Sequence, residues 1–364
     1  MKISIGSKII KGPFGGGNEF IRNLKIFFED RNYQVVDNLL DKDIDIILIT
    51  NPFLDSETST FNNYDVDYYI NFKNPNAIVF QRINECDERK GTKNLNSKLN
   101  YLNKNVDVNI YVSEWINDVY KNFEMSSKKS YVIKGGPNNK IFNSNNKSLW
   151  DKKKKIRLVT HHWSNNLMKG YLDYQYIDSL LGQGFDNEFD FTIIGNVPEN
   201  LKFKHSTILN PLSGLDLSTE LKKHDVYLTA SRNEPSGNHH MEGALCGLPV
   251  MYIDSGALPE YCENFGVLYN IDNFIDKLRE VKSNYENLTK NLKNYPYNFN
   301  NAAENYEKIF LESIKNKKSI LKKRYKNNKF KIVFFLFVNK LQQFSYKKLV
   351  KAKIFLGSLK KKGK

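Results

Sequence analysis

The sequence predicts an α/β protein with two doubly wound domains of similar size that face each other across a cleft. Its 364 residues are too many for one small core and suit two domains of about 150 residues each. Short apolar runs alternate with amphipathic stretches, as in parallel sheets with crossover helices. The alternation is interrupted by an Asn- and Lys-rich stretch at 138–155 and then restarts.

The first domain is predicted to span residues 1–145. Apolar runs bounded by turn residues indicate strands, and longer amphipathic stretches indicate helices. These patterns place strands at 2–10, 33–37, 44–50, 76–83, 106–113 and 131–135, and helices at 17–30, 93–104 and 114–124. Strands that alternate with helices in this way favour a parallel, Rossmann-like sheet.

The second domain is predicted to span residues 146–299, with a final helix near 300–316 that packs back on the first domain. The patterns place strands at 156–161, 189–195, 206–210, 225–230 and 249–254, and helices at 170–182, 217–223, 238–246, 258–263 and 271–292. Ligands of open α/β folds bind beyond the carboxyl ends of the strands, so the cleft between the domains is the expected site.

The run of residues 231–250 holds the most informative pair of side chains. Glu234 lies in a turn rich in Pro and Gly, and Glu242 lies one to two turns into an apolar helix that stops at Gly247. The free N–H groups at a helix N-terminus attract anions. A nucleotide-sugar needs these parts, namely a cradle for its diphosphate and carboxylates for its ribose and sugar hydroxyls.

This segment resembles the signature of the retaining glycosyltransferases of family 4, which have the GT-B fold. Their mark is a glutamate, seven residues, a second glutamate, a helix of small residues, Gly-x-Pro-Val and a later glycine and glutamate. The matching residues here are Glu234, Glu242, 247–250, Gly256 and Glu260. The resemblance covers roughly residues 1–315 and is specific at 231–260.

The resemblance implies a nucleotide-sugar donor held mainly by the second domain, with no required metal or other cofactor. Carried over, Glu242 would hold the ribose hydroxyls, and Glu234 would contact hydroxyls of the transferred sugar. The N–H groups of Gly237, Asn238 and His239 would face the diphosphate or the sugar. For a glutamate pair judged without its flanking residues, the alternative is two solvated side chains that form no binding site.

A second motif, at 160–170, follows the first strand of the second domain and opens a helix. A Lys-Gly pair at this place in the family supplies a cation to the leaving diphosphate, and Lys169 matches it. Many members carry an arginine five residues earlier, where this chain has Ser164. A lysine in the first turn of a helix opposes the helix dipole, which suits a role facing an anion. An ordinary exposed lysine is the alternative.

Two segments of the first domain are further candidates. The family has a glycine loop at the cleft similar to residues 12–18, and Gly16 is a candidate donor contact there, with a flexible turn as the alternative. No Gly-Lys-Ser/Thr follows, so the loop is not a Walker A motif. Family members recognise the acceptor near the place of the polar segment 81–91, at the carboxyl end of strand 76–83, which makes Arg82, Asn84 and Asp87 acceptor candidates. A charged surface loop is equally compatible with this segment.

The sequence gives little support for a metal site or for disulfides. His161 and His162 are adjacent on a strand and point to opposite faces. The three cysteines show no C-x-x-C pattern. The N-terminus lacks the apolar core and cleavage site of a signal peptide. A reducing cytoplasm is therefore the expected location.

The net charge of +15 comes from the C-terminus. Residues 313–364 hold 18 basic and no acidic side chains, leaving 37 basic against 40 acidic residues elsewhere. The apolar run 330–338, flanked by lysines, is too short to span a bilayer but suits a helix on an anionic membrane surface. We therefore expect residues 317–364 to be an amphipathic tail on the inner face of the membrane. Nucleic-acid binding or a disordered solubilising end are the alternatives.

Together these features predict a metal-independent, retaining glycosyltransferase that acts on a glycan or a lipid-linked acceptor. The breadth of the family favours cell-surface polysaccharide synthesis as the setting. Three alternatives stay open: a catalytically silent GT-B scaffold or glycan-binding subunit at the membrane, a nucleotide-sugar epimerase, and a phosphorylase.

Overall fold

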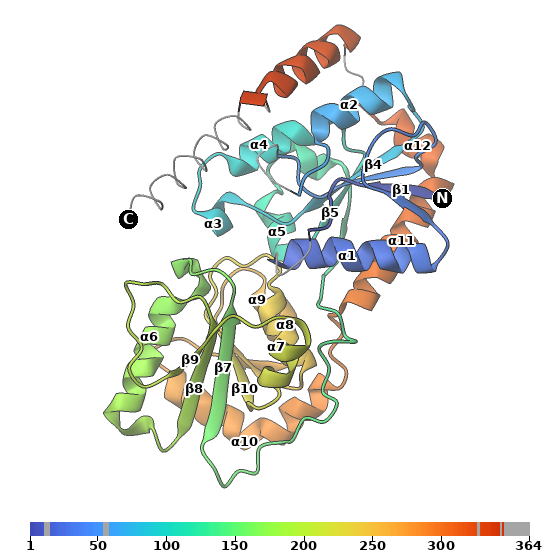
Figure 1. Cartoon of the computed structure of the whole chain (residues 1–364). Coiled ribbons are helices and arrows are strands. Elements are labelled where there is room, and N and C mark those ends of the chain that lie inside the picture. The colour runs from blue at the N-terminus through green and yellow to red at the C-terminus, as the bar shows by residue number, and fades with distance from the viewer. Residues whose placement is uncertain (11–14, 54–57, 326–327, 343, 346–364) are drawn as a thin grey trace, which may run out of the picture.

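The computed structural model describes residues 1–10, 15–53, 58–325, 328–342 and 344–345. Within these residues the chain forms two six-stranded sheets that are flanked by helices (Figure 1). Every strand pairing within the two sheets is parallel. The predicted architecture of two doubly wound α/β domains is therefore confirmed.

The first sheet has the strand order β2-β1-β3-β4-β5-β6. Its elements are β1 (Lys2–Ile5), α1 (Gly15–Asp30), β2 (Gln34–Val36), β3 (Ile46–Ile49), α2 (Asn63–Phe72), β4 (Ile78–Ile83), α3 (Asp87–Lys90), α4 (Leu95–Leu102), β5 (Val108–Tyr111), α5 (Glu114–Val119) and β6 (Lys129–Val132). Successive residues of a strand point to opposite faces. Ile46 and Leu48 of β3 therefore enter a core beneath α1, whereas Ile47 and Ile49 enter a second core beneath α2. Burial on both faces explains why β3 is apolar throughout.

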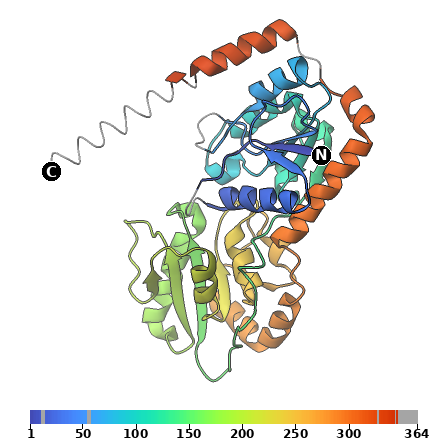
Figure 2. The ribbon, with the colours of Figure 1, turned by 45° about the vertical axis from the view of Figure 1, so that its right-hand side comes forward.

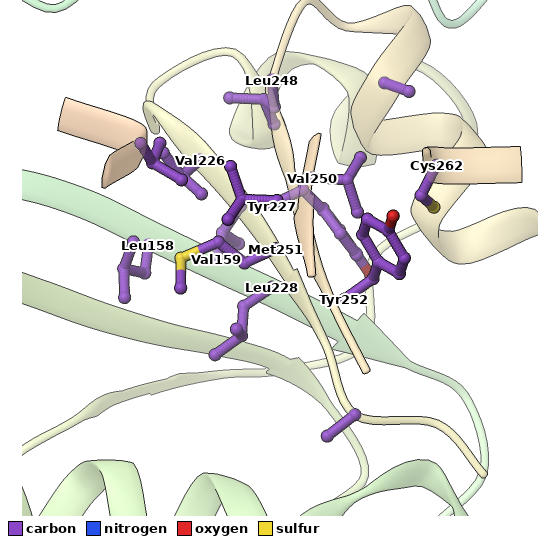
Figure 3. Close-up of a cluster of buried hydrophobic side chains, with 14 of the residues drawn as sticks. Leu158, Val159, Val226, Tyr227, Leu228, Leu248, Val250, Met251, Tyr252 and Cys262 are labelled. Atoms are coloured by element: carbon purple, nitrogen blue, oxygen red, sulfur yellow. The ribbon is translucent and has the colours of Figure 1, made fainter. Parts of the chain in front are cut away.

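The second sheet has the order β12-β11-β10-β7-β8-β9. Its elements are β7 (Ile156–His162), α6 (Tyr171–Leu180), β8 (Phe189–Gly195), β9 (Thr207–Leu209), α7 (Gly214–Leu221), β10 (Val226–Thr229), α8 (Asn238–Leu245), β11 (Val250–Tyr252), α9 (Leu258–Cys262), β12 (Gly266–Leu268) and α10 (Phe274–Leu292). Figure 3 shows part of its core, where Leu158, Val226 and Met251 from three adjacent strands lie close together. One continuous core holds this domain together.

The chain crosses between the domains twice, and the two crossings touch. Helix α10 packs in the second core, whereas α11 (Phe299–Lys315) packs in the first core with α1. The Phe299 N–H donates to the Pro137 carbonyl at 2.9 Å. A Cβ on Gly136 would lie 2.5 Å from the Asn298 backbone. A side chain at position 136 would therefore push the two crossings apart.

The chain beyond α11 stays on the first domain. Helix α12 (Lys317–Lys322) follows directly. A further helix at residues 329–342 runs past α2, as the red segment of Figures 1 and 2 shows. Among the described residues, no helix combines the length and apolar content needed to cross a bilayer.

Candidate active site

Loops from the two domains meet where both sheets have their carboxyl ends. Asn233, which follows β10, donates its Nδ2–H to the carbonyl of Glu88, which follows β4, at 3.0 Å. Gly16, which follows β1, lies so near α8 that a Cβ there would be 3.0 Å from Nδ2 of Asn238. Parallel strands present the loops at their carboxyl ends along one edge of a sheet, where ligands of such folds bind. The candidate site therefore lies between the domains.

Glu234 is shared by two cations, one from each domain. Its Oε2 atom lies 2.7 Å from Lys169 Nζ and 3.3 Å from Nη2 of Arg89. The Glu234 side chain is 9% exposed and the two cationic side chains are 14% exposed. Burial raises the pKa of Glu234, but the charges of Lys169 and Arg89 outweigh it, so the pKa falls below its usual value. Glu234 is therefore an anion, and two cations around it leave the group net positive.

The backbone of Glu234 is held by the turn after β11. Ala257 donates its N–H to the Glu234 carbonyl at 2.9 Å, and the Asn233 N–H donates to Oγ of Ser255 at 2.9 Å. Gly256 has a φ of +60°, and a Cβ there would lie 2.4 Å from the Glu234 nitrogen. Only glycine combines this backbone conformation with such a close approach. The motif glycine therefore serves to bring the two loops into contact.

Lys169 does not lie in the first turn of a helix, where the sequence predicted it. It ends a separate 3-10 turn, and α6 begins two residues later. Gly170 separates the two because its φ is +91° and a Cβ there would lie 2.5 Å from the Ala230 carbonyl oxygen. The direction of Lys169 toward Glu234 is therefore set by this left-handed turn, and the helix-dipole argument for Lys169 does not apply.

Helix α8 carries the second carboxylate. Oε2 of Glu242, in the second turn, lies 2.6 Å from Nε2 of His161 at the end of β7. The Glu242 side chain is 14% exposed. The N-cap residue Gly237 has no side chain, so the first N–H groups of α8, from Asn238 and His239 onward, receive no side-chain cap within the described structure. Uncapped N–H groups of this kind bind anions well.

The remaining donor-binding candidates differ in how far they are exposed and in which groups they contact. Ser164 is exposed, and its Oγ accepts the Asn166 N–H at 3.2 Å, which makes it part of a turn. The position that carries an arginine in many members of the resembled family thus holds a neutral hydroxyl. The ring of His239 is buried, with Nε2 2.9 Å from Oγ1 of Thr229, so its side chain faces the core. Residues 11–14 of the glycine loop lie outside the described residues.

The three acceptor candidates do not share one environment, since Arg82 lies in β4 and Asn84 and Asp87 follow it. The Arg82 guanidinium carbon lies 4.5 Å from the centroid of the Phe20 ring on α1. Asn84 is half-buried just beyond the strand. The Asp87 carboxylate accepts two N–H groups at the start of α4, both at 2.9 Å, and so closes its own loop. An acceptor-binding role for these three residues stays a prediction.

Sequence reasoning missed two contacts across the cleft. Arg89 lies in the polar segment after β4, but its partner belongs to the other domain, so no nearby residue signals its role. Glu260 was identified only as part of a motif. Its carboxylate accepts the N–H groups of Glu114 and Trp115 at 2.9 and 2.6 Å, and lies 3.3 Å from Lys134 Nζ. An anion on the N-terminus of α5 ties the second domain to the first.

Three buried histidines lie behind the site. Burial lowers the pKa of His162 and of His239 well below the ordinary value, and the charge of Lys169 adds to both effects. Burial also lowers the pKa of His240 to about 3. All three rings are therefore neutral near pH 7. In the described part of the chain, no cluster of three or more His, Cys, Asp or Glu side chains could hold a metal ion.

These histidines predict that stability falls as the pH drops below about 6.5. The unfolded chain binds protons there, whereas the folded chain does not, so folding is progressively disfavoured. Between pH 7.5 and 5.5 each ring lowers the free energy of unfolding by about 1.4 kcal/mol, and the three together lower it by about 4 kcal/mol. Urea unfolding at both pH values measures this loss. His240→Gln should reduce the measured loss by about 1.4 kcal/mol, and His205→Gln, at an exposed histidine, is the control. An equal loss in wild type and His240→Gln would contradict the assignment.

Comparison with known proteins bears on the fold. No protein-family model matches the chain, and no curated protein matches it by sequence. Several solved structures do match. The Anabaena protein HepE, in complex with UDP and glucose, superposes with a TM-score of 0.61 at 12% identity, over 86% of this chain and 99% of the other. The lipopolysaccharide outer core galactosyltransferase WaaB superposes with a TM-score of 0.60 at 13% identity, over 86% and 100%.

The fold is GT-B. The sucrose-phosphate synthase of Thermosynechococcus elongatus gives the same result, with a TM-score of 0.59 at 11% identity over 85% of this chain and 98% of the other. Identities this low establish the architecture alone. The predicted GT-B fold is thus confirmed, and its structural neighbours include a galactosyltransferase, a sucrose-phosphate synthase and a protein solved with UDP and glucose.

Proposed function

We propose that this protein is a retaining glycosyltransferase that needs no metal and moves a sugar from a nucleotide-sugar to a glycan or lipid-linked acceptor. The observation that supports this proposal best is the net positive group of Glu234, Lys169 and Arg89 beside the uncapped start of α8. A donor diphosphate is an anion that both features would stabilise.

The two cations would stabilise the leaving diphosphate from opposite sides of the cleft. Lys169 belongs to the second domain and Arg89 to the first, and both lie within 3.3 Å of the same carboxylate oxygen. Arg89 would thus supply the second cation that Ser164 does not. Because Arg89 comes from the other domain, this arrangement depends on the domains being closed.

The carboxylates would orient the rest of the donor. Glu242 accepts one hydrogen bond from His161 if that nitrogen carries the proton, and its other lone pairs remain for ribose hydroxyls. Glu234 would accept hydrogen bonds from hydroxyls of the transferred sugar once the diphosphate draws Lys169 and Arg89 away from it. With the donor bound, the cations that oppose the growing negative charge are in place before the reaction begins, which lowers the cost of reorganisation during the reaction.

The proposed reaction needs no protein nucleophile. The acceptor hydroxyl would attack the anomeric carbon on the face from which the diphosphate departs. The new bond joins that carbon to the acceptor oxygen as the bond to the phosphate oxygen breaks, and the hydroxyl proton passes to the departing oxygen. Domain closure would exclude the water that would otherwise hydrolyse the donor.

The acceptor would lie against the first domain, near Arg82, Asn84 and Asp87. Assembly of a cell-surface polysaccharide at the cytoplasmic face of a membrane is the setting that we propose. A catalytically silent scaffold and an epimerase are the competing functions. The cluster of buried charged side chains around Glu234 favours an enzyme over a scaffold, because such clusters with perturbed pKa values are typical of active sites.

A donor screen tests the proposal directly. We expect one class among UDP-, GDP-, ADP- and CMP-sugars to raise the melting temperature and to be hydrolysed slowly without an acceptor. Glu242→Ala should weaken binding of that donor about 10- to 100-fold, because it removes charged hydrogen bonds to the ribose. Glu263→Ala, at an exposed glutamate on the edge of α9, is the matched control and should bind normally.

The outcomes separate the candidates. Stabilisation by one donor that is lost in Glu242→Ala, together with release of free sugar, supports the transferase. Release of an epimerised nucleotide-sugar would favour the epimerase. A folded protein that no donor stabilises would overturn the proposal and favour the scaffold.

A further inference from the structure

The helix at residues 329–342 is fixed on the first domain by its inner face. Ile332 and Asn339, seven residues apart, are each 2% exposed. Asn339 donates its Nδ2–H to Oδ1 of Asn62, the N-cap residue of α2, at 3.2 Å. Lys340 Nζ lies 2.7 Å from Oδ1 of Asp65 in the first turn of α2. These contacts set which side of the helix faces the protein.

The chain that leads into this helix is also anchored. Arg324, 11% exposed, donates its Nε–H to Oδ1 of Asp107 at 2.9 Å and its Nη1–H to the Pro75 carbonyl at 2.8 Å. Asp107 is almost fully buried at the start of β5. A buried, bidentate pair of this kind holds its geometry well. Arg324 therefore fixes the chain to the first domain shortly before the helix begins.

The outer face of the helix is apolar and exposed. Phe330, Phe334 and Phe337 are 83%, 56% and 63% exposed, and Val333 and Leu341 are half exposed beside them. Spacings of three, four, seven and eleven residues put these side chains on one side of a helix, opposite Ile332 and Asn339. Monomeric soluble proteins rarely expose contiguous apolar surface on this scale, and such patches mark interaction sites.

Basic residues flank this outer face. Lys329 and Lys331 lie on either side of it in the helical repeat, and Lys322 and Lys323 precede it. Residues 313–364 contain 18 basic and no acidic side chains. A nucleic acid would require the cations themselves to face outward. Here aromatic side chains face outward with lysines at the margins, which matches the layers of an anionic bilayer interface.

We propose that the helix at 329–342 binds an anionic lipid bilayer, with its phenylalanines in the interface and its lysines among the headgroups. A helix of this length is about 20 Å long and lies flat. The bilayer would then lie against the first domain. This step rests on the proposed function: if the first domain binds the acceptor, the acceptor is one presented at a membrane surface, which favours a lipid-linked glycan.

Vesicle binding tests the proposal with the full chain. We expect the protein to sediment with vesicles of phosphatidylglycerol and phosphatidylcholine, and more weakly with phosphatidylcholine alone or at high salt. Phe334→Ser with Phe337→Ser should weaken binding to anionic vesicles about tenfold or more. Leu40→Ser with Leu215→Ser, which changes exposed leucines elsewhere, is the matched control and should leave binding unchanged.

The remaining outcomes would overturn the proposal. The first is equal vesicle binding by the phenylalanine variant and by wild type, and the second is binding to RNA in place of vesicles. The third is a wild-type dimer that the substitutions convert to a monomer, with no binding to vesicles. A melting temperature unchanged by the substitutions shows that the fold is intact. Vesicle binding needs no donor, so its failure leaves the transferase proposal untouched, and a failed donor screen leaves vesicle binding to be judged by itself.

Discussion

Replacing Lys169 with alanine is expected to lower donor turnover about 100- to 1,000-fold while the protein stays folded. A cation that faces charge developing in a water-poor site contributes several times more than one in water, and loss of one such donor group has effects of this size. Lys169 fits this description because its side chain is 14% exposed and its Nζ atom lies 2.7 Å from Glu234.

Two variants make this test specific. Lys282→Ala removes a lysine that also pairs with a glutamate, Glu188 at 3.0 Å, but at the opposite end of the second sheet; its turnover should be unchanged. Lys169→Arg keeps the charge and should retain more turnover than Lys169→Ala. Turnover in Lys169→Ala close to that of Lys282→Ala would count against a role at the diphosphate.

The sequence predicted the sheets well because their signal is local. The strands of the second domain are short apolar runs, and 189–195 matches β8 in both bounds. Helix α2 was not predicted, since Asn63–Phe72 shows no clear apolar repeat. It is stabilised instead by a capping box between Asn62 and Asp65 and by burial of Val66 and Tyr69. Strand β12, three residues long, was also missed.

The site was predictable only where a motif spans a short stretch of chain. Glu234 and Glu242 were found because a turn and a helix start lie beside them in sequence. Arg89 was not found, since its contact with Glu234 joins residues 145 apart. The predicted position of Lys169 in the first turn of a helix was wrong for a related reason. A left-handed Gly170 in close contact with Ala230, just beyond β10, depends on the tertiary fold, which a local pattern of residues does not encode.

Replacing Glu234 with glutamine is expected to impair both stability and turnover. The substitution keeps the side-chain volume but leaves the charges of Lys169 and Arg89, each within 3.3 Å of one atom, without their anion. Breaking a largely buried pair in this way costs about 3 kcal/mol of unfolding free energy. Turnover should fall about 100-fold, because the carboxylate that would orient the sugar is lost.

Pyrophosphate gives this prediction a signature that a purely structural role lacks. If the two cations face the donor diphosphate, added pyrophosphate should replace the missing negative charge and raise the melting temperature more in Glu234→Gln than in wild type. In Lys169→Ala the same addition should raise it less. Glu188→Gln is the matched control, since Glu188 also bridges two cations, Arg279 at 2.6 Å and Lys282 at 3.0 Å, away from the cleft. Equal pyrophosphate shifts in all four proteins would show that the cations around Glu234 hold the domains together and do not bind the diphosphate.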